Sequence, residues 1–193
     1  DAFYNNLKQL ITLAKNEDLY TYINVGNYKT LGSKTHLNLD LNWITINTGF
    51  SYIGRYNNIS ETSVVNPFSF GAEYNSSLTI NLNKVMNKFA LIDILHDANV
   101  AIFYKYTGDL PSFTLDANYN VQESVIEGYQ LLDINFSKKL YDKKIKLTAG
   151  CKNIFDIQDV SMTGIVSGVH QSTTNSMSVG YGRSFFASLK LIL

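Results

Sequence analysis

The sequence predicts an all-β fold: an antiparallel transmembrane β-barrel segment of about eight strands, with short periplasmic turns and long extracellular loops. Three observations support this fold class. Apolar and polar residues alternate with a period of two along most of the chain, which is typical of strands with two different faces. Short turns alternate with long polar connections. The polar positions hold mainly Asn, Ser, Thr and Gly, whereas the surfaces of water-soluble proteins are usually rich in charged residues.

The composition agrees with a single β domain that covers residues 1–193. Charged residues make up 17% of the chain, below the roughly 25% of typical soluble domains. The formal net charge is zero, so the charge pattern gives no indication of nucleic-acid binding. The single cysteine, Cys151, excludes an intrachain disulfide and a cysteine-based zinc site. No apolar run reaches the ~18 residues of a transmembrane helix, but barrel strands carry a much weaker signal.

The alternation of apolar and polar residues is weaker in the first expected strand than in the second. The early stretch LKQLITLAKN contains helix-forming residues, but its β-branched centre and its alternation favour a strand. The second strand ends in THLNLDLNW, which places Leu37 and Leu39 on one face and His36 and Asn38 on the other. The eight strands are expected near residues 3–14, 20–42, 44–56, 68–83, 91–107, 124–140, 144–157 and 182–193.

The third to seventh strands repeat this alternation. Their apolar faces include Ile46, Leu78, Ile102, Ile134 and Leu147, and their polar faces are mainly Asn, Ser and Thr. Aromatic residues lie toward the ends of several of these segments. Such positions are typical of the aromatic girdles at the two interfaces of a membrane.

The connections between the strands alternate in length. Short turns are expected near 42–44, 84–90 and 140–144, and long polar connections near 57–67, 108–123 and 158–181. Tight turns at one rim and long loops at the other are typical of outer-membrane barrels.

The last strand alternates to the final residue of the sequence. Phe185, Leu189, Leu191 and Leu193 share one face, although terminal segments usually tolerate change and fray. We expect this stripe to face lipid.

Three stretches resemble a known family. LTAGCKNIFD (147–156) resembles the penultimate strand of TonB-dependent outer-membrane receptors, and YGRSFFASLKLIL (181–193) resembles their last strand. YTYINVGNYKTLG (20–32) resembles a segment that precedes a long strand in these receptors. Two residues depart from the family pattern, because Leu193 replaces a usual aromatic residue and Cys151 a common valine.

The resemblance implies that the chain is the C-terminal part of a receptor barrel, without the N-terminal plug domain. The intact receptor would import a scarce nutrient, such as an iron chelate, haem, cobalamin or a glycan, across the bacterial outer membrane. Its partners would be outer-membrane lipid, the barrel assembly machinery, the nutrient ligand and, through the missing N-terminal part, TonB. The last strand would carry the assembly signal. Six family-motif residues are expected to be structural: Lys152, Asn153, Phe155, Asp156, Gly182 and Arg183.

The motif residues have an expected geometry. Lys152 and Ile154 are expected to point inward, and Asn153 and Phe155 outward, near the rim with long loops. Asn153 and Asp156 are expected to bond to backbone groups where the strand leaves the sheet.

Catalytic and metal-binding motifs are lacking in the sequence. None of the three histidines has a second histidine or a cysteine at metal-ligand spacing, and no nucleophile-elbow motif is found. We therefore expect no enzyme activity and no cofactor. His170, in the longest expected loop, is a candidate contact for the receptor's ligand, although a solvated loop residue is the simpler interpretation.

Two other functions remain open. The chain is long enough to be a complete eight-stranded outer-membrane barrel with a structural or adhesive role. A soluble ligand-binding β-barrel has the same alternation. The reading frame upstream of Asp1 separates the receptor from the small barrel, and folding without detergent identifies the soluble protein.

Overall fold

The computed structural model describes residues 1–16, 19–58, 68–83, 95–115, 121–163 and 176–192. The described chain is an all-β protein with its strands in one sheet. The strands are β1 (Ala2–Asn16), β2 (Leu19–Asp40), β3 (Ile44–Asn58), β4 (Ser69–Asn81), β5 (Ala98–Thr107), β6 (Leu110–Leu115), β7 (Val121–Ile126), β8 (Tyr129–Leu140), β9 (Ile145–Lys152), β10 (Asp159–Thr163), β11 (Ser176–Ser178) and β12 (Ser184–Leu191).

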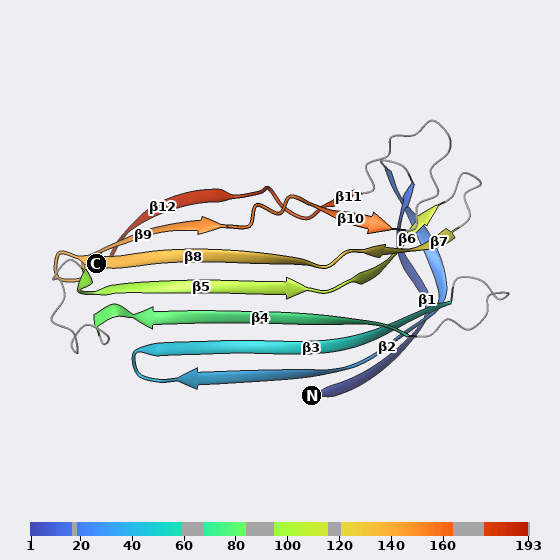
Figure 1. Cartoon of the computed structure of the whole chain (residues 1–193), viewed down its shortest axis with the longest axis horizontal. Helices are drawn as coiled ribbons and strands as arrows, with labels where there is room; N and C mark the ends of the chain where they lie inside the picture. The colour runs from blue at the N-terminus through green and yellow to red at the C-terminus, as the bar shows by residue number, and fades with distance from the viewer. Residues whose placement is uncertain (17–18, 59–67, 84–94, 116–120, 164–175, 193) are drawn as a thin grey trace.

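The sheet is open and almost entirely antiparallel. Its strand order is β11-β10-β7-β6-β1-β2-β3-β4-β5-β8-β9-β12. The long strands lie side by side along the molecule, and β6, β7, β10 and β11 lie toward one end of it (Figure 1). The one parallel pairing among the described strands joins β1 to β6 at Lys15 and Thr114. The sheet therefore forms an arc with unpaired edges, and the described chain does not close a barrel.

The expected number of about eight strands is wrong for the described chain, which has twelve strands. The two longest expected loops contain the additional ones. β6 and the first half of β7 lie within 108–123, and β10 and β11 lie within 158–181. Turn-forming residues in these segments suggested loops, but their backbone groups pair across hairpins, as Leu110 does with Ile126.

Three expected strand boundaries are also corrected. β5 begins at Ala98 rather than 91, because residues 95–97 form a turn in which Asp97 has a φ of 58°. β7 and β8 are separate strands with Glu127 and Gly128 between them. β9 ends at Lys152 rather than 157 because a turn begins at Asn153.

Two of the expected short turns are confirmed. Residues 41–43 connect β2 to β3, and residues 141–144 connect β8 to β9. Both turns lie at the end of the sheet that holds the C-terminus, whereas β1 starts part-way along the sheet (Figure 1). We call this end the short-turn rim. Residues 84–94, which contain the third expected turn, and 59–67, in an expected long loop, lie outside the described residues.

A small hydrophobic core lies away from the short-turn rim. Ala14 of β1 and Phe113 of β6 are buried against each other. Leu10, Ile23, Tyr28, Leu115 and Val121 pack around this pair. The core therefore joins the β6–β7 hairpin to the ends of β1 and β2. Elsewhere the sheet is a single layer, which leaves many large apolar side chains exposed.

The step from β5 to β6 is a tight backbone contact that requires glycine. The Gly108 amide donates a hydrogen bond of 2.8 Å to the Ala72 carbonyl oxygen. A Cβ atom at Gly108 would lie 2.7 Å from this same oxygen. The neighbouring strand therefore approaches more closely than any side chain at position 108 allows.

Gly108→Ala is expected to lower the free energy of unfolding by about 1–3 kcal/mol, because backbone atoms must move to relieve the clash. The measurement is urea unfolding of the folded chain. Gly180→Ala is the matched control, since a Cβ atom there would meet only the Ile157 carbonyl oxygen, at 3.7 Å. Equal stability of the two variants would contradict this account of Gly108.

Candidate functional site

The largest candidate site is a continuous apolar face that crosses the sheet. Strand pairing places one residue from each of seven neighbouring strands in a single row, from Leu39 on β2 to Phe185 on β12. The row consists of Leu39, Ile46, Leu78, Ile102, Ile134, Cys151 and Phe185. Because residues directly opposite each other lie on the same side of a sheet, these strands share one apolar face.

The last strand extends this apolar face as the sequence predicts. Phe185, Leu189 and Leu191 lie opposite Cys151, Leu147 and Ile145 of β9. The three β12 side chains are 79%, 64% and 64% exposed, so no described part of the chain covers them. Leu193, the fourth expected member of the stripe, lies outside the described residues.

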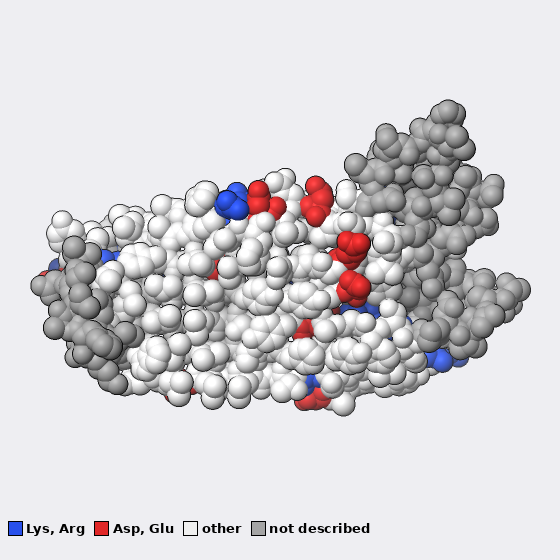
Figure 2. All heavy atoms as spheres, viewed as in Figure 1, with Lys and Arg blue, Asp and Glu red and all other residues white. Residues whose placement is uncertain are grey.

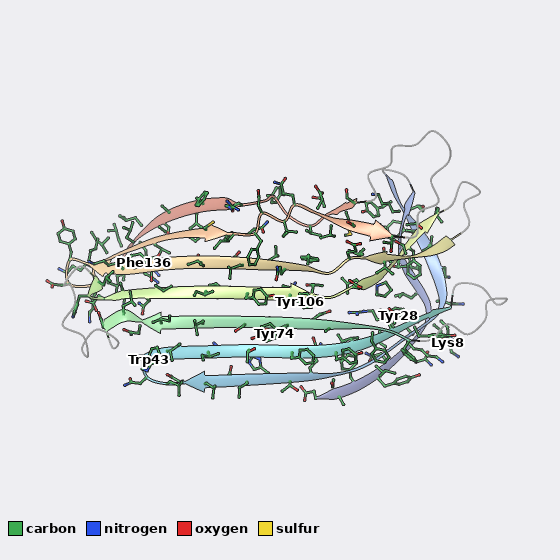
Figure 3. The ribbon with its side chains drawn as sticks, viewed as in Figure 1. Lys8, Tyr28, Trp43, Tyr74, Tyr106 and Phe136 are labelled. Carbon is green, nitrogen blue, oxygen red and sulfur yellow. The ribbon has the colours of Figure 1, made fainter. Side chains whose placement is uncertain are left out.

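Aromatic side chains lie at both borders of the apolar face. Trp43 lies in the turn between β2 and β3 and is 43% exposed. Tyr74 and Tyr106 are directly opposite each other on β4 and β5, farther from the short-turn rim (Figure 3). Near them the rings of Tyr52 and Phe70 stack with their centroids 5.1 Å apart. This arrangement is typical of residues at a membrane interface.

Charged groups lie mainly beyond these borders. In the view of Figure 2 most of the sheet surface is uncharged, and acidic side chains gather in a row across it, near the ends of β5 and β8 that lead to β6 and β7. Asp109, Glu127 and Asp156 are exposed and lie shortly after the ends of β5, β7 and β9, respectively. The 10 residues of β5 are about the 9–11 that a strand needs to cross a bilayer.

The opposite face of the sheet is polar. Its rows hold residues such as Asn47, Ser77 and Asp133, and Arg55 and Glu73 form an ion pair of 3.2 Å on it. An open hollow of about 340 Å³ lies over β3, β4, β5 and β8. Its lining on the polar face consists of Asn47, Asn75, Ser77, Phe103, Lys105, Leu131 and Asp133. Phe103 and Leu131 give the hollow an apolar part, and the amide, hydroxyl and charged side chains give it a polar one.

The family-motif residues meet where β9 ends. Asn153 is buried and has a φ of 51°, a left-handed conformation that asparagine tolerates better than most residues. Its side chain bonds to Ile157 twice: Nδ2 donates to the carbonyl oxygen at 2.8 Å, and Oδ1 accepts from the amide at 3.1 Å. The Asn153 amide donates to the Asp133 carboxylate at 2.8 Å. The expectation that Asn153 points outward is thus wrong, because the turn redirects its side chain to the backbone.

Asp156 and Arg183 join this turn to the start of β12. The Arg183 amide donates to Asp156 Oδ1 at 2.7 Å. Nε and Nη2 of Arg183 donate to the Ile154 carbonyl oxygen at 3.0 and 2.7 Å. The backbone hydrogen bond from Arg183 holds the pKa of the Asp156 carboxyl below its usual value.

Gly182 permits this close approach. Its φ is 79°, and a Cβ atom there would lie 2.9 Å from Asp156 Oδ1. The expected backbone bonds of Asn153 and Asp156 are confirmed, and the structure brings both motifs together. We call Asn153, Asp156, Gly182 and Arg183 the strand-exit cluster.

The remaining motif residues lie around this cluster. Lys152 is on the polar face, as expected, with Nζ 5.7 Å from the centre of the Phe186 ring. Phe155 is 42% exposed. Sequence reasoning missed Asp133, because only strand pairing shows that β8 brings this carboxylate to the Asn153 amide. His170 lies outside the described residues.

Within the described ranges, no three His, Cys, Asp or Glu side chains gather where they can hold a metal ion. The described residues also include no helix that is long and apolar enough to span a membrane. Comparison of the chain with protein-family models, with curated proteins and with solved structures finds no match.

Proposed function

We propose that this chain is the C-terminal part of the β-barrel of a TonB-dependent outer-membrane receptor, which imports a scarce nutrient. The single observation that carries the membrane assignment is the continuous apolar face from β2 to β12. Large exposed apolar patches are rare on soluble monomers. In a water-soluble protein a second layer of structure would therefore be expected to cover such a face.

The two faces of the sheet support different parts of this proposal. The apolar face contacts lipid between the two aromatic borders. The polar face, with its amide and hydroxyl side chains and its hollow, lines the aqueous interior. The unpaired edges of the arc are the places where further strands of a larger barrel pair, because exposed edges otherwise promote aggregation.

The receptor assignment depends on the two motifs near the C-terminus. The strand-exit cluster gives these motifs a shared structural role, because their residues bond to each other although they lie 27 and 29 positions apart in sequence. The nutrient is an iron chelate, haem, cobalamin or a glycan. The length and domain content of the reading frame before Asp1 test this assignment: a plug-like domain supports the receptor, and a signal peptide directly before Asp1 supports the small barrel.

Tryptophan fluorescence tests the membrane assignment directly. The chain has a single tryptophan, Trp43, at one border of the apolar face. In vesicles that contain brominated lipids, we expect bromine near the headgroups to quench Trp43 most strongly. In the variant Trp43→Phe with Leu78→Trp, we expect the strongest quenching from bromine deep in the acyl chains.

A variant on the opposite face gives the control. Leu78 and Thr79 are neighbours on β4 but lie on the apolar and the polar face. Trp43→Phe with Thr79→Trp is therefore expected to show little quenching by deep bromine. If both relocated tryptophans are quenched alike, or if the chain folds as a monomer in water, the membrane assignment is wrong.

A further inference from the structure

Three lysines lie directly opposite one another near the short-turn rim. The ladder between β8 and β9 pairs Lys139 with Lys146, and the ladder between β9 and β12 pairs Lys146 with Lys190. All three therefore lie on the same face, the polar one. We call them the lysine row.

Like charges in directly opposed positions destabilise a sheet, so the lysine row has a cost. In the described part of the chain, no carboxylate lies within ion-pairing distance of these three ammonium groups. The nearby turn adds Lys143 and Lys144. Of these two, only Lys143 approaches a carboxylate of the described residues, with Nζ 3.9 Å from Asp97 Oδ1. The same turn carries Asp142, and the Lys139 amide donates to the Asp97 carbonyl oxygen at 3.0 Å. Acids thus lie near the row, but among the described residues neither carboxylate forms an ion pair with one of its three lysines.

The position of the lysine row indicates what kind of partner balances it. Adjacent strands lie about 4.8 Å apart, so the Cα atoms of the three lysines extend over about 10 Å. Carboxylates three and four residues apart on a helix have a similar separation, about 5–6 Å. Leu147 and Leu189, on the neighbouring positions of β9 and β12, point to the apolar face. Lipid on that face is therefore on the wrong side of the sheet for these lysines.

We propose that the lysine row binds an acidic polypeptide segment on the polar face of β8, β9 and β12. The partner's carboxylates remove the repulsion between the lysines. This proposal concerns the polar face only and does not depend on which medium covers the apolar face.

A single substitution separates binding from stability. Lys146→Glu converts two repulsive cross-strand pairs into two attractive ones. We expect it to raise the urea concentration at the midpoint of unfolding and, at the same time, to abolish binding of the acidic partner. An unchanged or lower midpoint would overturn the claim that the row is repulsive in the free chain.

Binding is measured with the full chain 1–193, folded in an uncharged detergent, and a fluorescein-labelled hexaglutamate peptide as the probe. The triple variant Lys139→Gln, Lys146→Gln, Lys190→Gln is expected to weaken binding about tenfold, since each exposed ion pair contributes little. The matched control removes three positive charges elsewhere, with Lys8→Gln, Lys29→Gln and Lys34→Gln. It is expected to bind like the parent chain.

Two outcomes overturn the proposal. One is equal weakening by both triple variants, which would indicate a general charge effect. The other outcome concerns the lysine-row variant. If it no longer binds vesicles of phosphatidylcholine and phosphatidylglycerol but still binds the peptide like the parent chain, phospholipid is the partner. Both readouts use folded protein, so failure of the membrane assignment does not affect them.

Discussion

Leu78→Arg is expected to destabilise the chain folded in a bilayer by about 2–4 kcal/mol, the cost of arginine near the bilayer midplane. Leu78 lies in the middle of the apolar row, between Ile46 on β3 and Ile102 on β5. An arginine there has apolar neighbours on both adjacent strands and no described carboxylate across either ladder. The measurement is urea titration of the chain folded in vesicles, with folding followed by gel mobility of unheated samples.

Thr79→Arg is the matched control for this substitution. Thr79 is the next residue on β4, is exposed, and lies between Thr45 and Ala101 on the polar face. Because this face is proposed to contact water, Thr79→Arg is expected to change the folding free energy by less than about 1 kcal/mol. The opposite order of the two effects would assign the polar face to lipid and would reverse the proposed orientation of the sheet.

Asn153→Ala is expected to cost about 2–3 kcal/mol of unfolding free energy and to release the turn after β9. The substitution removes both side-chain bonds to Ile157, each of which is worth about 1 kcal/mol. It also places alanine at a φ of 51°, which adds roughly 1 kcal/mol of backbone strain. Denaturant unfolding measures the total, and hydrogen exchange of the Ile157 amide reports on the turn itself.

Asn153→Gly separates the two contributions. Glycine accepts the left-handed conformation without strain but makes no side-chain bond, so we expect a loss of only about 1–2 kcal/mol. Both variants should accelerate exchange at Ile157. If glycine is as destabilising as alanine, the backbone conformation contributes nothing and the hydrogen bonds account for the entire effect.

The strand-exit cluster shows which part of a motif the sequence can predict. The sequence indicates that Asn153 and Asp156 bond to backbone where a strand ends, because short polar side chains do this locally. It does not show that Asp156 accepts the Arg183 amide or that Arg183 donates to the Ile154 carbonyl. These contacts span the segment 157–182, and only the pairing of β9 with β12 brings the two ends together.

The expectation of long loops at 108–123 and 158–181 was wrong for a related reason. Residues 108–123 contain Pro, Gly, Asp and Asn, which favour turns. Local propensity is weak in strands, however, and β6 and β7 form because each satisfies the backbone groups of the other. Loop length counted from turn residues therefore overestimates the irregular part of the chain.

By itself, the sequence determined the all-β fold, the approximate positions of the long strands and which residues share a face. A strand alternates sides at every residue, so the two faces can be read from local order alone. Tertiary structure decided the register that aligns seven apolar residues in one row. It also decided the pairing of β6 with β7 and of β10 with β11, and the lysine row. These features depend on which backbone groups pair across strands far apart in sequence, and such pairing depends on the whole sheet rather than on any one segment.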